Sequence, residues 1–425
     1  MRQGLEVAEA QQLVLSAAQP LPPENLAVGR ALGRALAEPV RSTRRLPPAD
    51  CSAMDGYAVR AADLQGADRR PVTLRLAYEV AAGGLCPRPL GTGEAARIFT
   101  GAPVPPGADS VVRQEDAEAG DGVVHIRVAP SPREHVRDAG EDVEPGDRVL
   151  DAGHVIGPAE VGVLASLGRT VVRVSQRPRV AILSGGDELV EVDGDVAGGR
   201  IVSSNSYTLS AQCRLLGAEP VYLGIARDRP DDLERLLAAG LHSDCIVSSA
   251  GVSVGDHDHV RPVLEKLGCR LHFWGVKMKP GFPVAFGSFE AAGGPLVFGL
   301  PGNPVSASVA FEQFVRPALR RMMGHPHPFL PTLPVRVAQT LEKKPGRLHF
   351  VRVRLRREGD QWWATSTGNQ SSGVLTSLAR ADGLLVFPAE ATRLRAGERA
   401  QVQLLDVDAL GDGSEAPGSA ERPWG

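Results

Sequence analysis

Aromatic residues and cysteines are scarce in this chain of 425 residues. Aromatics make up only 4% of it, so stacking platforms for single-stranded nucleic acid are not expected. The cysteines lie far apart, at 51, 86, 213, 245 and 269, and no two of them form a CxxC pair. This spacing argues against a disulfide framework and a thiolate zinc site, and it favours the reducing cytoplasm.

Long apolar runs are also absent. The first twenty residues include Glu6 and Glu9 and contain no apolar core of a secretory signal. Glycines and prolines interrupt the one long uncharged stretch, residues 291–311, too often for a membrane span. The net charge of -3 provides no field that would attract a polyanion, so we expect neither membrane nor nucleic-acid binding.

The length predicts two to four domains at roughly 150 residues each. We expect a helical linking domain formed by residues 1–45 and 141–176, interrupted by a β-rich inserted domain over 46–140. An α/β domain over 177–328 and a C-terminal β domain over 329–408 follow, and the Gly/Ser/Pro/Glu-rich residues 409–425 are expected to be a disordered tail.

The α/β domain has the clearest pattern. Apolar runs at 180–183, 220–225, 245–248 and 296–300 alternate with helical segments at 206–216, 231–239, 258–267 and 304–322. This alternation predicts an open parallel sheet with helices on both faces. After it, β-prone runs at 350–355, 362–365, 384–387 and 400–405 predict a sheet of their own.

Ligands of an open α/β sheet bind at the carboxyl ends of its strands. The loops expected there contain Gly185–Gly186 and Gly251 with Gly255, which allow backbone N–H groups to approach a ligand. Asn303 and Pro304 fit the N-cap and first position of a helix, whose free donors favour anions. These loops predict a phosphate site, although each of them alone could be an ordinary turn.

Three acids, Glu188, Asp228 and Asp258, are expected near the same loops. Two unit charges about 4 Å apart interact by roughly 4 kcal/mol at an effective dielectric of 20, so acids beside a phosphate repel it. A divalent cation between them reverses the sign, and oxygen ligands are those that Mg²⁺ prefers. Each acid alone could also be a solvated surface residue.

Two further features allow other interpretations. Residues 251–255 match the G-x-S-x-G motif of serine hydrolases, with Ser253 as nucleophile, but no clear pair of Asp and His loops follows. Lysine occurs only five times, and Lys277 and Lys279 share one Pro-Gly loop. They could bind an anion or simply be solvated.

Seven short stretches together, in this order and at this spacing, resemble the molybdopterin molybdenumtransferase family and the carboxyl-terminal domain of gephyrin. They are S-A-M-D-G-Y-A at 52–58, I-F-T-G-A at 98–102, G-E-D at 140–142, G-D-E-L at 186–189, G-V-S-V-G at 251–255, M-K-P-G at 278–281 and G-L-P-G-N-P-V-S at 299–306. The resemblance covers about residues 5 to 405.

The resemblance implies a transferase that inserts molybdate into adenylylated molybdopterin and releases AMP with the help of Mg²⁺. It implies an α/β domain of the molybdopterin-binding type and a C-terminal domain like a β-barrel. The implied catalytic residues are Asp55, Thr100, Asp142, Glu188, Asp228, Asp258 and Lys279, with Glu188 and Asp228 at the metal. The implied substrate-binding residues are Gly186, Asp187, Ser206, Gly251, Ser253, Gly255, Lys277, Pro301, Gly302, Asn303, Pro304, Arg352 and Ser372.

The family also implies a homodimer whose cleft joins the α/β domain of one subunit to other domains of its partner. A molybdopterin adenylyltransferase and the maturation proteins of molybdoenzymes are the further partners that it implies. The sequence departs from the family at Gly185, where threonine is usual, and at Phe282, where many members have a second lysine. A pterin-binding scaffold without turnover, or a serine hydrolase using Ser253, are the alternatives.

Overall fold

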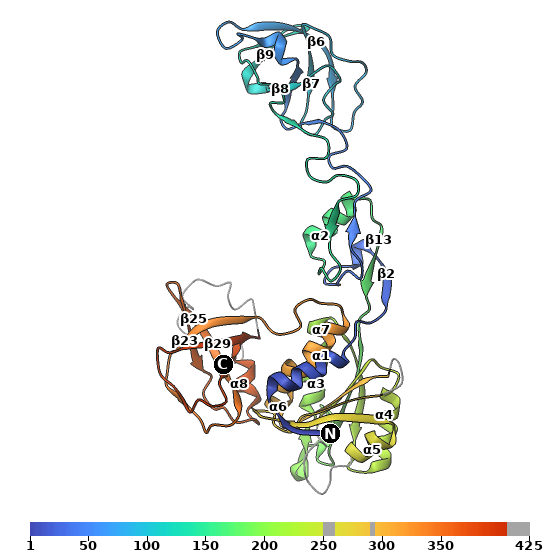
Figure 1. Ribbon diagram of the computed structural model, residues 1–425, viewed down its shortest axis with the longest axis vertical. Helices are drawn as coiled ribbons and strands as arrows, with labels where there is room; N and C mark the ends of the chain where they lie inside the picture. The colour runs from blue at the N-terminus through green and yellow to red at the C-terminus, as the bar shows by residue number, and fades with distance from the viewer. Residues whose placement is uncertain (250–259, 290–293, 406–425) are drawn as a thin grey trace. The chain divides into compact units, whose positions relative to one another are not determined.

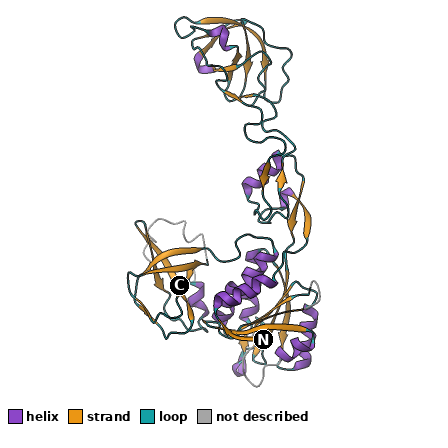
Figure 2. Cartoon of the chain, in the orientation of Figure 1, coloured by secondary structure: helices purple, strands orange, loops and turns teal. Residues whose placement is uncertain are grey.

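The structure, a computed structural model, describes residues 1–249, 260–289 and 294–405. The chain divides into two compact units, which are described separately. The first comprises Met1–Ala37, Gly153–Gly157 and Val171–Gly425, and the second comprises Glu38–Ala152 and Pro158–Thr170. Figures 1 and 2 show the elements of both units. Among the described residues, no helix is both long and apolar enough to cross a membrane.

A seven-stranded sheet forms the centre of the first unit. In sheet order its strands are β1 (Arg2–Leu5), β19 (Cys269–Val276), β21 (Ala285–Phe289), β22 (Leu296–Leu300), β18 (Cys245–Ser249), β14 (Arg179–Gly185) and β17 (Glu219–Ala226). β22, β18, β14 and β17 are parallel, whereas β21 is antiparallel to both of its neighbours. The predicted α/β sheet is therefore present, with one reversed strand that the sequence pattern did not indicate.

Both faces of this sheet are covered by helices. α1 (Val7–Ala17), α3 (Ser204–Leu216), α6 (Pro304–Ala310) and α7 (Arg316–Met322) pack on one face, and α4 (Pro230–Gly240) and α5 (Val260–Lys266) on the other (Figure 1). In β14, Val180 and Ile182 belong to the first core and Ala181 and Leu183 to the second. Burial on both faces explains why the strand is a continuous apolar run.

The structure differs from the expectation in one helix and in the first residues of the chain. The helix expected over 304–322 is present as α6, a π-helical segment η5 (Phe311–Val315) and α7. Residues 1–45 are expected in the linking domain, but the first strand of that range, β1, pairs in parallel with β19, and α1 packs on the α/β core.

The C-terminal part of the first unit is a closed barrel. Its sheet has the order β20 (Met278–Lys279), β25 (Leu348–Glu358), β26 (Gln361–Ser366), β23 (Thr332–Val337), β29 (Arg399–Leu404) and β27 (Gly383–Phe387), and pairing of β25 with β27 closes it. Val351, Val353, Leu385 and Val402 are part of its interior core. Because β20 follows a strand of the α/β domain and pairs with Leu348 and His349, this ladder joins the barrel to that domain.

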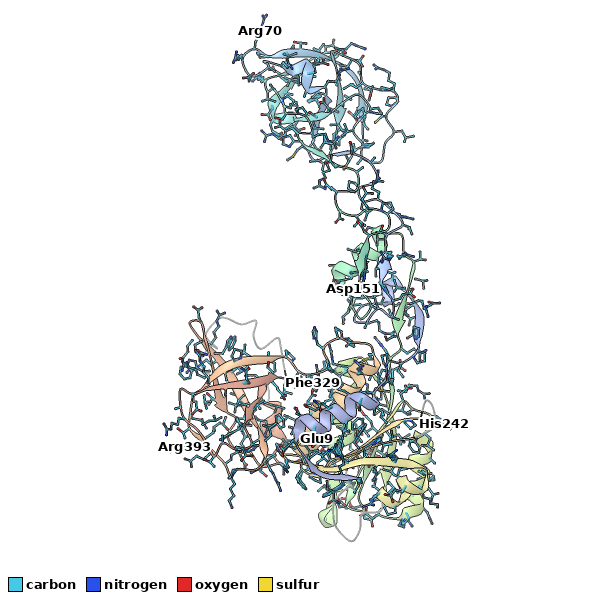
Figure 3. The ribbon with its side chains drawn as sticks, in the orientation of Figure 1. Glu9, Arg70, Asp151, His242, Phe329 and Arg393 are labelled. Atoms are coloured by element: carbon cyan, nitrogen blue, oxygen red, sulfur yellow. The ribbon has the colours of Figure 1, made fainter. Side chains whose placement is uncertain are left out.

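Short elements complete the first unit. They are η1 (Val28–Arg30), η4 (Ala197–Gly199), α8 (Leu375–Ala379) and the strand pairs β2 (Pro23–Ala27) with β13 (Val171–Ser175), β15 (Leu189–Val190) with β16 (Ile201–Val202), and β24 (Leu341–Glu342) with β28 (Arg393–Leu394). Arg393 lies at the surface of the barrel (Figure 3).

The second unit is built around a six-stranded sheet. Its strand order is β8 (Ser110–Arg113), β5 (Gly56–Val59), β7 (Glu94–Ile98), β6 (Val72–Val80), β10 (Val123–Ile126) and β9 (Ala117–Ala119). The unit also contains η2 (Ala61–Leu64), η3 (Gln114–Asp116), α2 (Pro158–Ser166) and the pairs β3 (Val40–Arg41) with β12 (Arg148–Leu150) and β4 (Cys51–Ser52) with β11 (Val136–Arg137). A Cβ on Gly56 would lie 1.9 Å from the Val112 carbonyl oxygen, so only glycine fits at this point of S-A-M-D-G-Y-A.

Candidate functional site

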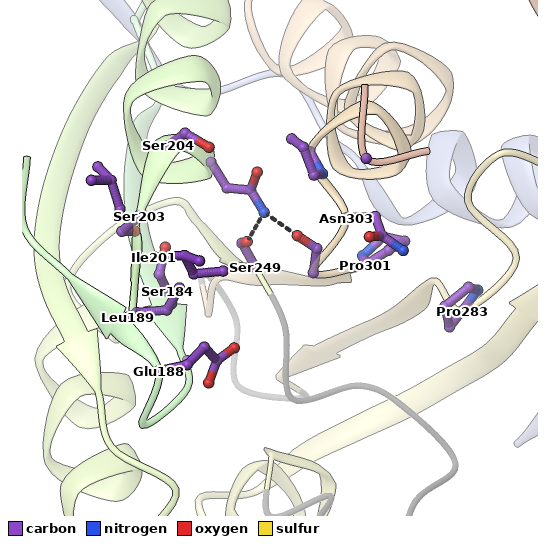
Figure 4. Close-up of a pocket in the computed structure, with 16 residues that line it drawn as sticks. Ser184, Glu188, Leu189, Ile201, Ser203, Ser204, Ser249, Pro283, Pro301 and Asn303 are labelled. Atoms are coloured by element: carbon purple, nitrogen blue, oxygen red, sulfur yellow. Dashed lines mark hydrogen bonds between the residues drawn. The ribbon is translucent and has the colours of Figure 1, made fainter. Parts of the chain in front are cut away.

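A cavity of about 640 Å³ lies at the carboxyl ends of three parallel strands of the first unit (Figure 4). Ser184 and Gly185 at the end of β14, Ser249 at the end of β18 and the loop after β22 form much of its wall. From that loop, Pro301, Gly302, Asn303 and Pro304 line the cavity. This is the edge of the sheet at which the strand pattern predicts a ligand.

Asn205 at the start of α3 connects two of these walls. Its Nδ2 donates to the Ser249 hydroxyl oxygen at 2.7 Å and to the Gly302 carbonyl oxygen at 2.7 Å (Figure 4). The Ser184 hydroxyl is buried and has no hydrogen-bond partner among the described residues. Buried hydroxyls usually have a partner, so the wall retains capacity for a polar ligand.

Two acidic loops lie beside each other at one side of the cavity. The carboxylate of Asp187 accepts from the Asp228 N–H at 3.2 Å, and the carboxylate of Asp228 accepts from the Asp187 N–H at 3.4 Å. Glu188 lines the cavity. Gly186 has a φ of 144°, and a Cβ there would lie 2.6 Å from a Glu188 carboxylate oxygen. The glycine therefore leaves room for this carboxylate beside the loop of Asp228.

The acids fit a hydrated divalent cation better than a closed protein cage. Within the described residues, no group of three or more His, Cys, Asp or Glu side chains could hold a metal. Mg²⁺ typically uses one or two carboxylates and completes its shell with water and phosphate oxygens. Glu188, which lines the cavity, and Asp228, which is not in its described lining but accepts from the Asp187 N–H, are the two carboxylates that could hold such an ion.

A second cavity of about 480 Å³ is lined by positively charged side chains. Its described lining includes Lys279, Arg347, Ser306, Gln370 and Ser372, and no carboxylate among the residues that the structure describes. Among the described residues, the Lys279 ammonium makes no hydrogen bond or ion pair. The Arg347 guanidinium lies 4.6 Å from the centre of the Phe282 ring. Unpaired cations and hydroxyls around one space are suited to an oxyanion.

Arg352 lies fully buried behind this cavity. Its Nη2 donates to the Ser371 carbonyl oxygen at 3.0 Å and its Nε to the Ser377 hydroxyl at 3.2 Å, while Nη1 has no partner among the described residues. Burial lowers the pKa of Arg352 to about 10. The guanidinium thus holds the loop at Ser371 and adds positive charge beneath it.

One wall separates the two cavities. The Val305 N–H, at the start of α6, donates to the Ser372 carbonyl oxygen at 3.1 Å. On one side of this bond Pro304 and Gly373 line the larger cavity, and on the other Ser306 and Ser372 line the smaller one. A ligand that spans both cavities would therefore meet the barrel loop and the helix start together.

Several predicted site residues lie elsewhere. The Lys277 ammonium pairs with Glu6 at 2.7 Å, and the Ser206 hydroxyl donates to the Ser203 carbonyl oxygen at 2.8 Å; neither residue lines the two cavities. Asn303 occupies the N-cap position without a side-chain capping bond. The predicted residues Gly251, Ser253, Gly255 and Asp258, and the predicted tail 409–425, lie outside the described residues.

The remaining predicted residues belong to the second unit. The Asp55 carboxylate accepts from the Thr100 N–H at 2.7 Å and from its hydroxyl at 2.9 Å. These two bonds, and secondarily the charge of Arg97, lower the pKa of Asp55. Asp142 is exposed, and its N–H donates to the Leu46 carbonyl oxygen at 3.1 Å. Asp55 and Thr100 thus form one hydrogen-bonded group in the second unit.

Sequence reasoning missed three residues that the cavities make prominent. Ser184 and Asn205 line the larger cavity, and Arg347 lines the smaller one. Arg347 stands in the same segment as Arg352, five positions earlier, and this nearness to a predicted site residue was the available signal. Asn205 and Ser184 resemble any polar residue near a helix start or strand end, so sequence alone offered no signal for them.

Comparison with known proteins covers nearly the whole chain. Residues 5–168 match the family described as MoeA N-terminal region (domain I and II). Residues 181–321 match a probable molybdopterin binding domain, and residues 334–405 match the MoeA C-terminal region (domain IV).

Curated relatives and a solved structure agree with these matches. A protein of Nostoc sp. is 39% identical over 387 residues, which cover 89% of this chain and 87% of that protein. One of Haemophilus influenzae is 36% identical over 388 residues, covering 90% and 94%. Both are named molybdopterin molybdenumtransferase. The crystal structure of a molybdopterin biosynthesis MoeA protein from Pyrococcus horikosii superposes with a TM-score of 0.81 at 32% identity, covering 94% of this chain and 99% of that one.

Proposed function

Since the chain belongs to the molybdopterin molybdenumtransferase family and is a transferase of molybdenum cofactor biosynthesis, we propose that it inserts molybdate into adenylylated molybdopterin and releases AMP. The observation that carries this proposal is the pair of adjoining cavities with different chemistry. One is lined by the Glu188 carboxylate and polar walls, and the other by serine hydroxyls and by Lys279 and Arg347, neither of which pairs with an acid among the described residues. A nucleotide-linked pterin and an oxyanion are two substrates with these separate requirements.

The larger cavity would hold the phosphate and nucleotide end of the pterin substrate. The loop from Pro301 to Pro304 supplies backbone groups and the Asn303 amide, and Asn205 keeps that loop beside Ser249. Glu188 and Asp228 would hold Mg²⁺. When bound there, the ion would supply neutralisation of phosphate charge that these carboxylates alone would repel. Gly186 keeps space for the Glu188 carboxylate.

The smaller cavity would bind molybdate. Lys279 and Arg347 provide positive charge and Ser372 a hydroxyl, while Arg352 fixes the loop from behind. Arg347, supported on the Phe282 ring, places a cation beside the residue that is lysine in many members of the family. The sulfurs that bond to molybdenum belong to the substrate, so the chain contributes positioning and electrostatic stabilisation and no nucleophile.

We infer further that the active form is a cytoplasmic homodimer. Asp55, Thr100 and Asp142 of the partner subunit would complete each site, as the family resemblance implies. The adenylylated substrate would come from a molybdopterin adenylyltransferase, and the product would pass to maturation proteins of molybdoenzymes.

The test is to incubate the full chain with adenylylated molybdopterin, Mg²⁺ and molybdate and to follow AMP by chromatography. We expect AMP release that requires molybdate and is lost with a chelator. Equal AMP without molybdate would mean plain hydrolysis. Binding of the pterin nucleotide without AMP release would mean a scaffold. Activity that is indifferent to a chelator and lost in Ser253→Ala would favour a serine hydrolase.

A further inference from the structure

Arg97 of β7 lies at the point where two of the family-like stretches meet in the second unit. It is the pairing partner of Tyr57 in β5. Its guanidinium lies 5.1 Å from the centre of the Tyr57 ring and 5.0 Å from that of Phe99. Its Nη1 donates to the Gly56 carbonyl oxygen at 3.3 Å and its Nη2 to the Gln114 side-chain oxygen at 2.8 Å.

Three of these contacts, with Gly56, Gln114 and Phe99, involve a neighbour of Asp55 or of its partner Thr100. Gly56 follows Asp55 in the chain, and the Gln114 N–H donates to the Asp55 carbonyl oxygen at 3.0 Å. Phe99 precedes Thr100, whose N–H and hydroxyl hold the Asp55 carboxylate. Arg97 therefore contacts both the backbone on which Asp55 stands and the segment that binds its carboxylate.

We propose that Arg97 is a positioning residue that holds the Asp55 carboxylate on Thr100. This inference rests on the proposed function only in taking Asp55 as a participant in the reaction. A planar guanidinium can stack on aromatic rings while its fixed fork of N–H donors reaches two acceptors, whereas a lysine ammonium has no planar group to stack. Its charge, close to Asp55, also favours the ionised carboxylate.

The first test does not depend on activity. Amide hydrogen exchange by mass spectrometry is compared in full-length wild type, Arg97→Gln, Arg97→Lys and Arg127→Gln. Arg127 is a matched control, an exposed arginine of the same domain that pairs with Glu118. In Arg97→Gln we expect the Thr100 and Gln114 amides to exchange on the order of tenfold faster, with a smaller effect in Arg97→Lys and none in Arg127→Gln.

The amides of the β6–β10 ladder report whether the domain remains folded. If Arg97→Gln also accelerates exchange in that ladder, the domain is disturbed as a whole, and the proposal is then judged on Arg97→Lys. This variant retains the charge and the aliphatic stem and so disturbs the fold less. Acceleration confined to Thr100 and Gln114 then supports the proposal. Unchanged exchange at Thr100 in a folded Arg97 variant overturns it.

A double-mutant cycle tests whether Arg97 acts through Asp55. In an active wild type, we expect Arg97→Gln to lower kcat for AMP release on the order of tenfold to hundredfold, with little change in the KM for molybdate. We also expect the acid limb of the pH profile to move to higher pH, and Arg97→Lys to restore part of the rate. In an Asp55→Asn background, Arg97→Gln should cost nothing further.

An equal additional loss in both backgrounds would show that Arg97 acts independently of Asp55 and would overturn the proposal. A wild type that releases no AMP with molybdate would instead refute the proposed function. In that case the exchange experiment still decides whether Arg97 positions Asp55.

Discussion

Asn205 and Ser249 are joined by a hydrogen bond of 2.7 Å from Nδ2 to the hydroxyl oxygen. Because the same Nδ2 also donates to the Gly302 carbonyl oxygen, one buried amide connects the start of α3 to the ends of two neighbouring strands. The relative positions of the loops that line the larger cavity depend on this side chain.

We predict that Asn205→Asp and Asn205→Ala both weaken binding of the pterin nucleotide. Aspartate keeps the shape but replaces both donors by acceptors that face the Gly302 carbonyl oxygen, and alanine leaves buried groups unpaired. Each change should lower the free energy of unfolding by about 1–3 kcal/mol and raise Kd by tenfold or more, about 1.4 kcal/mol. Urea unfolding and calorimetric titration measure the two effects. Wild-type affinity in Asn205→Asp would show that the amide has no role in the site.

Gly186→Ala should inactivate the enzyme without unfolding it. The new methyl group would lie 2.6 Å from a Glu188 carboxylate oxygen, at a φ of 144° that disfavours any side chain. The carboxylate must move, so we expect loss of AMP release and a higher Mg²⁺ requirement. Gly29→Ala is the control, because a Cβ added to Gly29 would have no atom within 4 Å. Normal activity in Gly186→Ala would argue against a role for the Glu188 carboxylate.

We predict that changing Glu188 or Asp228, the two proposed metal ligands, alters the Mg²⁺ dependence, and that changing another acid does not. We expect Glu188→Gln and Asp228→Asn each to raise the Mg²⁺ concentration for half-maximal AMP release on the order of tenfold or more, because each removes a carboxylate ligand. Glu234→Gln is a matched control, since Glu234 pairs with Lys266 on the outer helix α4. Equal Mg²⁺ curves for all three variants would contradict the assignment of the metal ligands.

Strand and helix order in the α/β domain could be predicted because burial on both faces makes its strands continuous apolar runs. The same pattern predicted where the larger cavity lies, since ligand loops follow parallel strands. β1 could not be predicted in this way. Its four residues, R-Q-G-L, have no strand periodicity, and the pairing with β19 spans most of the chain. Tertiary packing therefore decides that element.

The chemistry of the site was only partly readable from sequence. Glu188 and Lys279 stand in distinctive loops, and each lines one of the two cavities. Lys277 stands two positions from Lys279, yet its ammonium pairs with Glu6. Sequence spacing alone does not separate the two lysines, because which of them meets a cavity depends on the pairing of β20 with the barrel.

We predict that Lys279 and Arg347 of the smaller cavity each contribute to molybdate binding. Lys279→Ala and Arg347→Ala each remove one cation of the cavity lining, so we expect the KM for molybdate to rise on the order of tenfold, with little change in the KM for the pterin nucleotide. Lys344→Ala, at an exposed lysine of the same barrel, should leave both unchanged. Kinetics with each substrate varied in turn provide the comparison. An unchanged molybdate KM in both cavity variants would place the oxyanion elsewhere.

Two buried histidines should make the first unit less stable in mild acid. Burial and neighbouring cations lower the pKa of His349 and of His325 to about 4, from 6.5. For His349 the cations are Lys279, Arg352 and Lys343, and for His325 they are Arg320 and Arg316. Between pH 6.5 and 4 the unfolded chain binds protons that the folded chain does not. The free energy of unfolding must therefore fall as pH falls through this window, by at most about 1.4 kcal/mol per pH unit for each ring.

His349→Leu isolates one of these contributions. Both ring nitrogens of His349 are buried without partners among the described residues, so leucine removes the titration and also an unsatisfied polar group. We expect the variant to be more stable than wild type at pH 5 and to lose less stability between pH 7 and 5. Urea unfolding followed by tryptophan fluorescence reports on this unit, which contains Trp274, Trp362 and Trp363. His242→Leu, at an exposed histidine (Figure 3), should follow the wild-type curve. Equal pH dependence in His349→Leu and wild type would mean that the ring binds protons equally in the folded and unfolded states, so that burial does not lower its pKa.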